Sequence, residues 1–269
     1  MNAKVNYLTI LSEDNYALGR FYEAFFHMRP AGANGPTDDV HIGDGHIGLN
    51  IKPRLSGHAA QLDQFGIETD DVERVIARLN ENYPEIEWLQ RSGGASITAI
   101  SSHDPAGNVF FVSQVGMKDC GDVYVGAGGA QDRLIDHFAL RVLGPEKVAE
   151  FYAQVFGFQT IAGPKESRNF YLSDGHVTLV IIPWQISDFE GTGITARGMD
   201  HIGFKVESIA TLKADIDRAA EKNHRFRPSA SVVGRGKEGK GRLEMFRKAC
   251  PLGCHHMADL DGLLLDVTE

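Results

Sequence analysis

The sequence of 269 residues repeats itself, and this repeat constrains the possible folds more than any other feature. Four pairs of segments match in the same order along the chain, with offsets of 130, 130, 137 and 155 residues. The pairs are RFYEAFFHMRP (20–30) with EFYAQVFGFQT (150–160), GDGHIGLNI (43–51) with SDGHVTLVI (173–181), DQFGIETDDVERVIARL (63–79) with DHIGFKVESIATLKADI (200–216), and HDPAGNVFFV (103–112) with ADLDGLLLDV (258–267). Because the offset only grows, the chain is predicted to hold two copies of one module, the second enlarged by two insertions.

Local patterns predict the same order of elements in both copies. A short apolar strand, NYLTI or DHFAL, precedes an amphipathic helix with Phe21 and Phe25, or Phe151 and Val155, on one face. DGH between two apolar runs predicts a hairpin turn in which the glycine adopts a positive φ. A further strand, HIGFKV in the second copy, leads into the helix SIATLKADIDRAAEKN, and a turn such as DPAGN or DLDG precedes the last strand. The expected order is β-α-β-β followed by β-α-β-β in each copy.

These elements predict an α+β fold of tandem paired βαβββ modules with mixed sheets. The first module is expected at 1–116 and the second at 132–269, with the Gly-rich segment 117–131 as the linker between them.

Composition narrows the function. With 42% apolar and 23% charged residues, the chain is typical of a soluble globular protein, and its apolar runs are too short to cross a bilayer. No basic stretch followed by a long apolar core opens the sequence, and only three cysteines occur, which favours the cytoplasm. The net charge of −9 disfavours nucleic acid as a partner. Positive charge nevertheless gathers between Lys222 and Lys248, where nine Lys and Arg stand against two Glu. This run is either a solvated loop or a site for an anionic substrate.

The paired modules, the DHxxxxV strands at 136–142 and 200–206, and the D-x-x-G turn before the last strand resemble the vicinal oxygen chelate superfamily. This superfamily includes glyoxalase I, bleomycin and fosfomycin resistance proteins, and extradiol ring-cleavage dioxygenases. The resemblance covers nearly the whole chain, and its two-module length is most similar to the extradiol type. It implies that one cupped sheet holds a divalent metal through a His on its first strand, a His on the strand after the hairpin, and a Glu on its last strand.

The repeat indicates which copy could hold that metal. The three positions fall on His137, His201 and Asp266 in the second copy. Their counterparts in the first copy are Tyr7, Gln64 and Phe111, and this trio offers no imidazole or carboxylate ligand. The second copy is therefore predicted to hold the metal and the first to be structural. The alternative is that the two histidines are hydrogen-bonded core residues. The neighbouring Asp136 is expected to face solvent or to cap a turn.

Asp266 departs from the resemblance, which implies Glu. Its side chain is one methylene shorter, which would draw the metal about 1 Å nearer to the strand or require a bridging water. Glu269 lies three residues further on, where a strand directs side chains to the opposite face, so Asp266 is the predicted ligand and Glu269 the alternative.

The proton-transfer residues implied by the extradiol resemblance are not reproduced. A histidine would be expected near Ile186, where none occurs, and a tyrosine would be expected where His256 stands. Adjacent residues of a strand point to opposite faces, so only one of His255 and His256 can face the cup. His256 and Asp266 are an even number of residues apart, so His256 is predicted to lie on the same face as Asp266. His256 is therefore the candidate general acid–base, with an exposed histidine pair as the alternative. Cys250 and Cys254 do not match a zinc-finger spacing and are expected to be core or strand residues.

The segment before the last strands supplies candidate substrate ligands. Four glycines among basic residues predict a mobile loop, in which Lys237, Lys240, Arg242 and Arg247 could pair with a substrate carboxylate. Trp184 and Phe189 could stack on an aromatic ring.

The sequence therefore predicts a metal-dependent enzyme, with an extradiol-type ring-cleavage dioxygenase acting on a small, anionic aromatic substrate as the first hypothesis. Its cofactor would be a divalent metal, Fe(II) first, with Mn, Zn, Ni or Co as alternatives. A glyoxalase-type lyase, isomerase or hydrolase is the second hypothesis, and a metal-free binding protein of the resistance type is the third. The expected partners are a small molecule and further copies of this chain in a homo-oligomer, with neither nucleic acid nor a membrane.

Overall fold

The computed structural model describes residues 1–32, 38–90, 99–117, 124, 132–188, 197–226, 244, 246–248, 250 and 252–269. Of the predicted linker, it describes only Met117 and Tyr124. Among the described residues, no helix is long and apolar enough to cross a membrane.

The first half of the chain forms an eight-stranded mixed sheet of order β2-β3-β4-β1-β5-β8-β7-β6 within the described residues. Its elements are β1 (Ala3–Ser12), α1 (Asn15–Phe26), β2 (Arg29–Pro30), β3 (Val40–Gly43), β4 (Gly48–Pro53), β5 (Gln61–Thr69), α2 (Val72–Asn82), β6 (Trp88–Gln90), β7 (Ile100–His103) and β8 (Val109–Gln114). The central strand β1 pairs in parallel with β4 and antiparallel with β5.

The second half forms a seven-stranded sheet of order β10-β11-β12-β9-β13-β15-β14 within the described residues. Its elements are β9 (Leu134–Val142), α4 (Pro145–Phe156), β10 (Gln159–Thr160), β11 (Phe170–Ser173), β12 (Thr178–Pro183), β13 (Gly198–Lys205), α6 (Ile209–Lys222), a 3₁₀ turn (His224–Phe226), β14 (His255–Ala258) and β15 (Leu264–Thr268). The strand order matches that of the first half from β10 to β14, so the predicted repeat and α+β fold are confirmed. The two-residue edge strands β2 and β10 were not predicted, because they are too short to show a period.

Sequence signals account for the helices. Asp14 and Asp71 accept hydrogen bonds from backbone N–H groups in the first turns of α1 and α2, and Ser208 does the same for α6. Gly157 ends α4 in the left-handed conformation, which costs glycine little. Each helix buries one face against its sheet.

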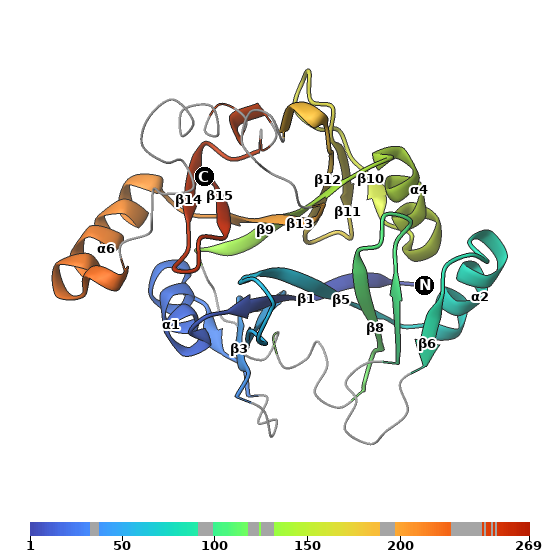
Figure 1. The fold of residues 1–269 in the computed structure, drawn as a ribbon, viewed down its shortest axis with the longest axis horizontal. Coiled ribbons are helices and arrows are strands. Elements are labelled where there is room, and N and C mark those ends of the chain that lie inside the picture. The colour runs from blue at the N-terminus through green and yellow to red at the C-terminus, as the bar shows by residue number, and fades with distance from the viewer. Residues whose placement is uncertain are drawn as a thin grey trace.

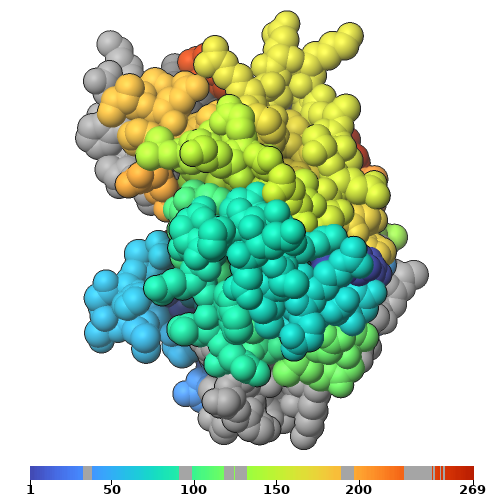
Figure 2. Space-filling view, turned by 90° about the vertical axis from the view of Figure 1, so that its right-hand side faces the viewer, coloured from blue at the N-terminus to red at the C-terminus, as the bar shows by residue number. Residues whose placement is uncertain are grey.

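The two halves share one continuous hydrophobic core. Phe26 stacks on Phe204 with ring centroids 3.9 Å apart, and Phe65 lies 5.1 Å from Phe138. Figure 1 shows the second half lying over the first, with α1 below α6 on one side and α2 beside α4 on the other. In Figure 2 the surfaces of α2 and α4 meet closely.

Two pairs of equivalent contacts connect the halves. The Asp44 carboxylate accepts the Ile135 N–H at 2.8 Å, and its counterpart Asp174 accepts the Val5 N–H at 2.7 Å. Likewise the Tyr22 hydroxyl donates to Asp259 at 2.8 Å, and the Tyr152 hydroxyl donates to Asp104 at 3.0 Å. Both tyrosines are fully buried. Each half therefore supplies hydrogen-bond donors and acceptors to the other. The polar groups of the loops in one half are satisfied only when the other half is in place.

Removing either tyrosine hydroxyl should therefore destabilise the protein. Tyr22→Phe and Tyr152→Phe each leave a buried carboxylate short of a donor and should lower the free energy of unfolding by about 1–3 kcal/mol. Urea denaturation measures the effect. Tyr16→Phe is the control, since Tyr16 is 56% exposed and its change should be near zero.

Asp259 should also make stability depend on pH. Burial raises the pKa of Asp259 to about 6, against opposing hydrogen bonds from Tyr22 and Leu263. A carboxyl whose pKa is raised by folding stabilises the protein below its unfolded pKa, and this contribution is lost as pH rises through about 6. The wild type should therefore gain about 1 kcal/mol relative to Asp259→Asn between pH 7 and pH 5. A constant difference between the two proteins over this range would contradict the expectation.

Candidate metal centre

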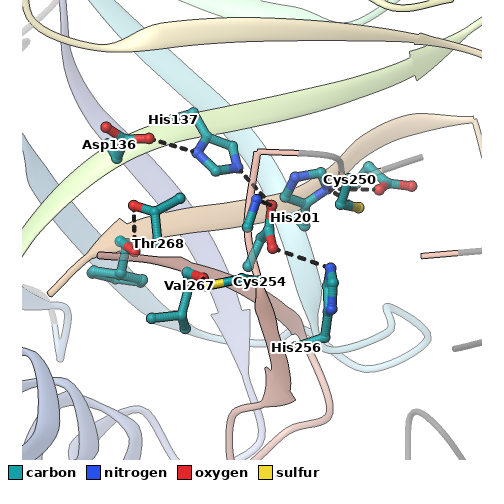
Figure 3. Close-up of polar contacts among 12 residues, drawn as sticks. Asp136, His137, His201, Cys250, Cys254, His256, Val267 and Thr268 are labelled. Atoms are coloured by element: carbon teal, nitrogen blue, oxygen red, sulfur yellow. Dashed lines mark hydrogen bonds and ion pairs between the residues drawn. The ribbon is translucent and has the colours of Figure 1, made fainter. Parts of the chain in front are cut away.

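Three adjacent strands of the second sheet bring the predicted ligands together. His137 lies on β9, His201 on β13 and Asp266 on β15, and β13 pairs with both other strands. One ligand atom from each residue lies within 4.8 Å of the others. All three side chains are buried, and the His137 Nε2 lies 3.2 Å from Asp266 Oδ2 (Figure 3).

The alternation of β9 separates this site from the main core. Phe138 and Leu140 point into the core shared by the two halves. The intervening residues His137, Ala139 and Arg141 therefore point to the opposite face of the sheet, which we call the site face. Ala139 packs there in a small apolar cluster with Tyr171, Val180 and Ile182, against which Leu252 lies.

Gly203 makes room for His137. It is paired with both His137 and Asp266, and a Cβ at this position would lie 2.0 Å from His137 Cε1. In the first half, Gly66 has the same relation to Tyr7 and Phe111. Gly203 and Gly66 each follow the second ligand position by two residues, and each must be glycine because a ring of the neighbouring strand occupies the space of a side chain. The sequence shows these glycines in HIG (201–203) and QFG (64–66).

Register shifts place an aspartate beside each histidine. The pairing of β9 and β13 skips Asp200 on one strand and Asp136 on the other. A bulge redirects the extra residue, so that an aspartate and the histidine after it can meet. Asp136 Oδ2 lies 3.0 Å from His137 Nδ1, and Asp200 Oδ2 lies 2.8 Å from His201 Nδ1. Asp136 faces solvent in part, as expected, with its side chain 36% exposed, but its contact with His137 was not predicted, because an alternating strand pattern does not reveal a bulge.

These contacts orient both imidazoles. A carboxylate that accepts the Nδ1 proton leaves Nε2 with its lone pair free to bind a metal, as the carboxylate–histidine–metal arrangement requires. The Nε2 of His201 is buried and has no hydrogen-bond partner among the described residues. Such an atom is costly unless something binds it. Two imidazoles and one carboxylate with an unpartnered buried nitrogen fit a divalent metal such as Fe(II), Mn(II) or Zn(II).

The charges of the site support each other. Burial would raise the pKa of Asp266, but the hydrogen bond from His137, the adjacent His256 imidazole and the charge of His201 lower it well below its usual range. Burial alone would lower the pKa of His137, but hydrogen bonds to Asp136 and Asp266 outweigh it and raise that pKa. Burial would also raise the pKa of Asp200, and the charge of Arg141 reverses this. The carboxylates are therefore ionised, as metal ligands and their partners must be.

Other predicted residues fall around these three. His256 on β14 is opposite Asp266, and its Nε2 lies 3.1 Å from Asp266 Oδ1. The Gly253 N–H donates to Asp266 Oδ2 at 3.0 Å. Glu269 instead accepts the Ile209 N–H at 2.8 Å, at the start of α6. Asp266, and not Glu269, therefore lies with the histidines.

Cys250 is buried, as expected of a core residue, yet it borders the site. Its Sγ lies 3.5 Å from His201 Nδ1, and it forms a second possible ligand group with His256 and Asp266. Cys254 is exposed and is a free thiol. No spacing rule had singled out Cys250, because its position depends on the fold.

The predicted substrate residues are only partly placed. Arg247 is exposed and lines a pocket of about 700 Å³ that also includes Arg141. Trp184 is half-buried and is not among the described residues that line this pocket. Lys237, Lys240, Arg242 and Phe189 lie outside the described residues.

The equivalent face of the first half is occupied by aromatic side chains. Tyr7 is buried and packs with Tyr124 and Ala31, with the two tyrosine rings 6.1 Å apart. Tyr124 comes from the predicted linker, and its hydroxyl lies 3.0 Å from His41 Nδ1. The three described positions that correspond to the metal ligands thus provide no imidazole and no carboxylate.

Comparisons with known proteins agree with this architecture. Residues 134–266 match the model of the Glyoxalase/Bleomycin resistance protein/Dioxygenase superfamily. The second module therefore belongs to this superfamily, and the two-module fold of the chain matches that of extradiol dioxygenases. No curated protein matches the sequence.

Several solved structures share the fold at low identity. The chain is 15% identical to a catechol 2,3-dioxygenase, with 98% of this chain and 91% of the other covered at a TM-score of 0.59. It is 15% identical to the Mn(II)-bound glyoxalase from Novosphingobium aromaticivorans, with coverage of 98% and 81% and a TM-score of 0.64. A xylose isomerase-like TIM barrel/4-hydroxyphenylpyruvate dioxygenase fusion protein is 17% identical at a TM-score of 0.55, and the match covers 80% of this chain and 38% of the fusion.

The repeat supplies a matched test of the aspartates. Asp200→Asn weakens the partner of His201 and should lower metal affinity about 10- to 100-fold, because such outer contacts fix the tautomer and orientation of a ligating imidazole. Asp63→Asn changes the residue skipped at the equivalent shift in the first half and should leave metal affinity unchanged. Competition with a chromophoric chelator measures both, with circular dichroism as the check on folding. Equal affinity in the two variants would contradict the role of Asp200.

Proposed function

We propose that this protein is a metal-dependent enzyme that binds a small substrate through two neighbouring oxygens, with extradiol-type ring cleavage as its reaction. The observation that supports this most is the buried group of His137, His201 and Asp266, in which the His201 Nε2 has no partner among the described residues. Two histidines and one carboxylate leave metal positions open for substrate and O₂, which is the donor set of non-haem iron oxygenases. Fe(II) is the proposed metal.

The metal, when bound, supplies Lewis-acid stabilisation of the deprotonated diol and a place for O₂. His137, His201 and Asp266 would hold it. Asp136 and Asp200 fix the Nδ1 atoms of the two histidines. The apolar cluster of Ala139, Tyr171, Val180 and Ile182 excludes water on one side of the site face and provides a surface for a ring.

His256 is the proposed proton-transfer group. Its side chain is 4% exposed, and its Nε2 makes the 3.1 Å contact with Asp266 without hydrogen-bond geometry. An imidazole nitrogen can both accept and donate a proton, so His256 could accept a proton from a substrate hydroxyl and return it at a later step. It would thereby replace the tyrosine that the family resemblance implies at this position.

A glyoxalase-type lyase, isomerase or hydrolase is the second candidate, with Mn, Zn, Ni or Co as metal. The fold of the Mn(II)-bound glyoxalase supports it. The resemblance implies that glyoxalases take ligands from both modules, however, and Tyr7 and Gln64 occupy those positions here. The metal-free binding protein is the third candidate. We also propose a homo-oligomer in the cytoplasm, in keeping with the free thiols of Cys250 and Cys254.

Metal content and oxygen consumption together test the proposal. The purified protein should contain about one iron per chain and should consume one O₂ for each catechol converted. His201→Ala should lose the metal and the activity, since the site keeps only one imidazole. Gln64→Ala alters the equivalent position in the first half and should preserve both.

Three outcomes separate the candidates. Zinc or nickel without O₂ uptake would favour the lyase or isomerase. A folded protein that binds no divalent metal would favour the binding protein. Metal retained at the wild-type level in His201→Ala would show that the ligands are elsewhere.

A further inference from the structure

A polar pocket of about 700 Å³ opens at the ends of β9 and β12. Its described lining includes five basic residues: Arg141, Lys165, Arg168, Arg247 and Lys248. Three acids, Glu166, Asp188 and Glu244, also line it, so positive charge is in excess. Four of the five basic side chains are exposed and by themselves would be an ordinary solvated surface.

Arg141 is different from the other four. It is 1% exposed, and its Nε donates to Asp200 at 2.6 Å while Nη1 donates to Asp188 at 3.2 Å. Its Nη2 is buried and has no hydrogen-bond partner among the described residues. A guanidinium is a planar fork suited to a carboxylate, and an unpaired buried donor costs free energy. The pocket is therefore lined by a buried donor group that has no acceptor among the described residues.

Arg141 is also connected to the metal centre. It contacts Asp200, and Asp200 contacts His201 Nδ1 at 2.8 Å, so two polar contacts separate the guanidinium from a ligand imidazole. Since each contact spans about 3 Å, the open Nη2 and the His201 Nε2 are on the order of 10 Å apart. Ala139 and Ile182 of the apolar cluster lie on the strands β9 and β12 that also carry Arg141 and Pro183 to the pocket. The metal site, the buried apolar cluster and the Arg141 guanidinium, whose Nη2 has no partner among the described residues, thus follow one another on the site face.

We propose that this pocket binds the carboxylate of the substrate, with Arg141 Nη2 as the buried donor and Arg168, Arg247 and Lys248 around it. The proposal rests on the proposed function for the oxygen pair at the metal, and it names the substrate class as an aromatic acid. Its catechol end lies at the metal, its ring on the apolar cluster, and its carboxylate at Arg141. The substrate carboxylate is thus bound by Arg141 of strand β9 as well as by Arg247 and Lys248 of the segment before β14.

The test compares 3,4-dihydroxybenzoate, its methyl ester and benzoate, by calorimetry on the purified protein with oxygen excluded. The acid should bind about 10- to 100-fold more tightly than the ester, the range expected for a hydrogen-bonded charge pair. Benzoate lacks the diol and should bind weakly to protein stripped of metal. Arg141→Met should abolish the preference for acid over ester.

Arg141→Met also strips Asp200 of its cation, so a second variant protects the test against misfolding. Arg168→Gln/Arg247→Gln/Lys248→Gln changes three exposed residues and should reduce the preference at least about 3-fold, by removing the charge around the donor. Arg20→Gln/Arg74→Gln/Lys222→Gln removes three exposed charges outside the pocket lining and should leave it unchanged.

The two proposals fail differently. Equal binding of acid and ester by a metal-containing wild type would overturn the carboxylate pocket and leave the metal enzyme standing. If the wild type binds no divalent metal but still binds benzoate in a way that depends on the three exposed cations, the pocket is supported and the proposed function is overturned. An acid preference equal in all three variants would overturn the assignment of these residues.

Discussion

The pairing of β9 with β13, with one register shift on each strand, is the interaction on which the site depends. It places His137 and His201 on the same face and gives each a neighbouring aspartate, Asp136 or Asp200, at its Nδ1. A regular ladder would direct each aspartate to the opposite face, into the core that holds Phe138 and Ile202. Because of each shift, an aspartate contacts the histidine that follows it and fixes the orientation of that imidazole. Gly203 completes the arrangement, because any side chain there would occupy the space of the His137 ring.

The same shifts occur between β1 and β5, where the skipped residues are Asn6 and Asp63. Both modules thus share the two register shifts of the backbone. Whether a module can bind a metal depends on the side chains at these positions. In the first half those side chains are Tyr7 and Gln64, and Tyr124 packs over the face. The first half in turn stabilises the second: Tyr22 donates to Asp259 in the loop that leads into β15, the strand of Asp266. The half without ligands therefore helps to position one of them.

Sequence reasoning reached the architecture and the trio of His137, His201 and Asp266, because a repeat compares each position with its own counterpart. It could not predict the role of Asp136, since a bulge leaves no mark in an alternating pattern. It could not find Arg141, because an arginine inside an apolar strand is distinguished only by what surrounds it. Cys250 was expected in the core but not beside His201. The edge strands β2 and β10 escaped because two residues show no period.

By itself, the sequence determined that the chain contains two copies of one module, that the two copies form the helices α1, α2, α4 and α6 and the longer strands in a common order, and that only the second copy offers imidazoles and a carboxylate at matched positions. These follow from periodicity and residue type, which are local properties. Only the tertiary structure decided that Asp266 and not Glu269 joins the histidines, that each histidine has an aspartate at Nδ1, and that the Nη2 of Arg141, at a pocket, has no acceptor in the part of the chain that the structure describes. Those depend on register, on burial and on contacts between strands far apart in the chain, which no local pattern records.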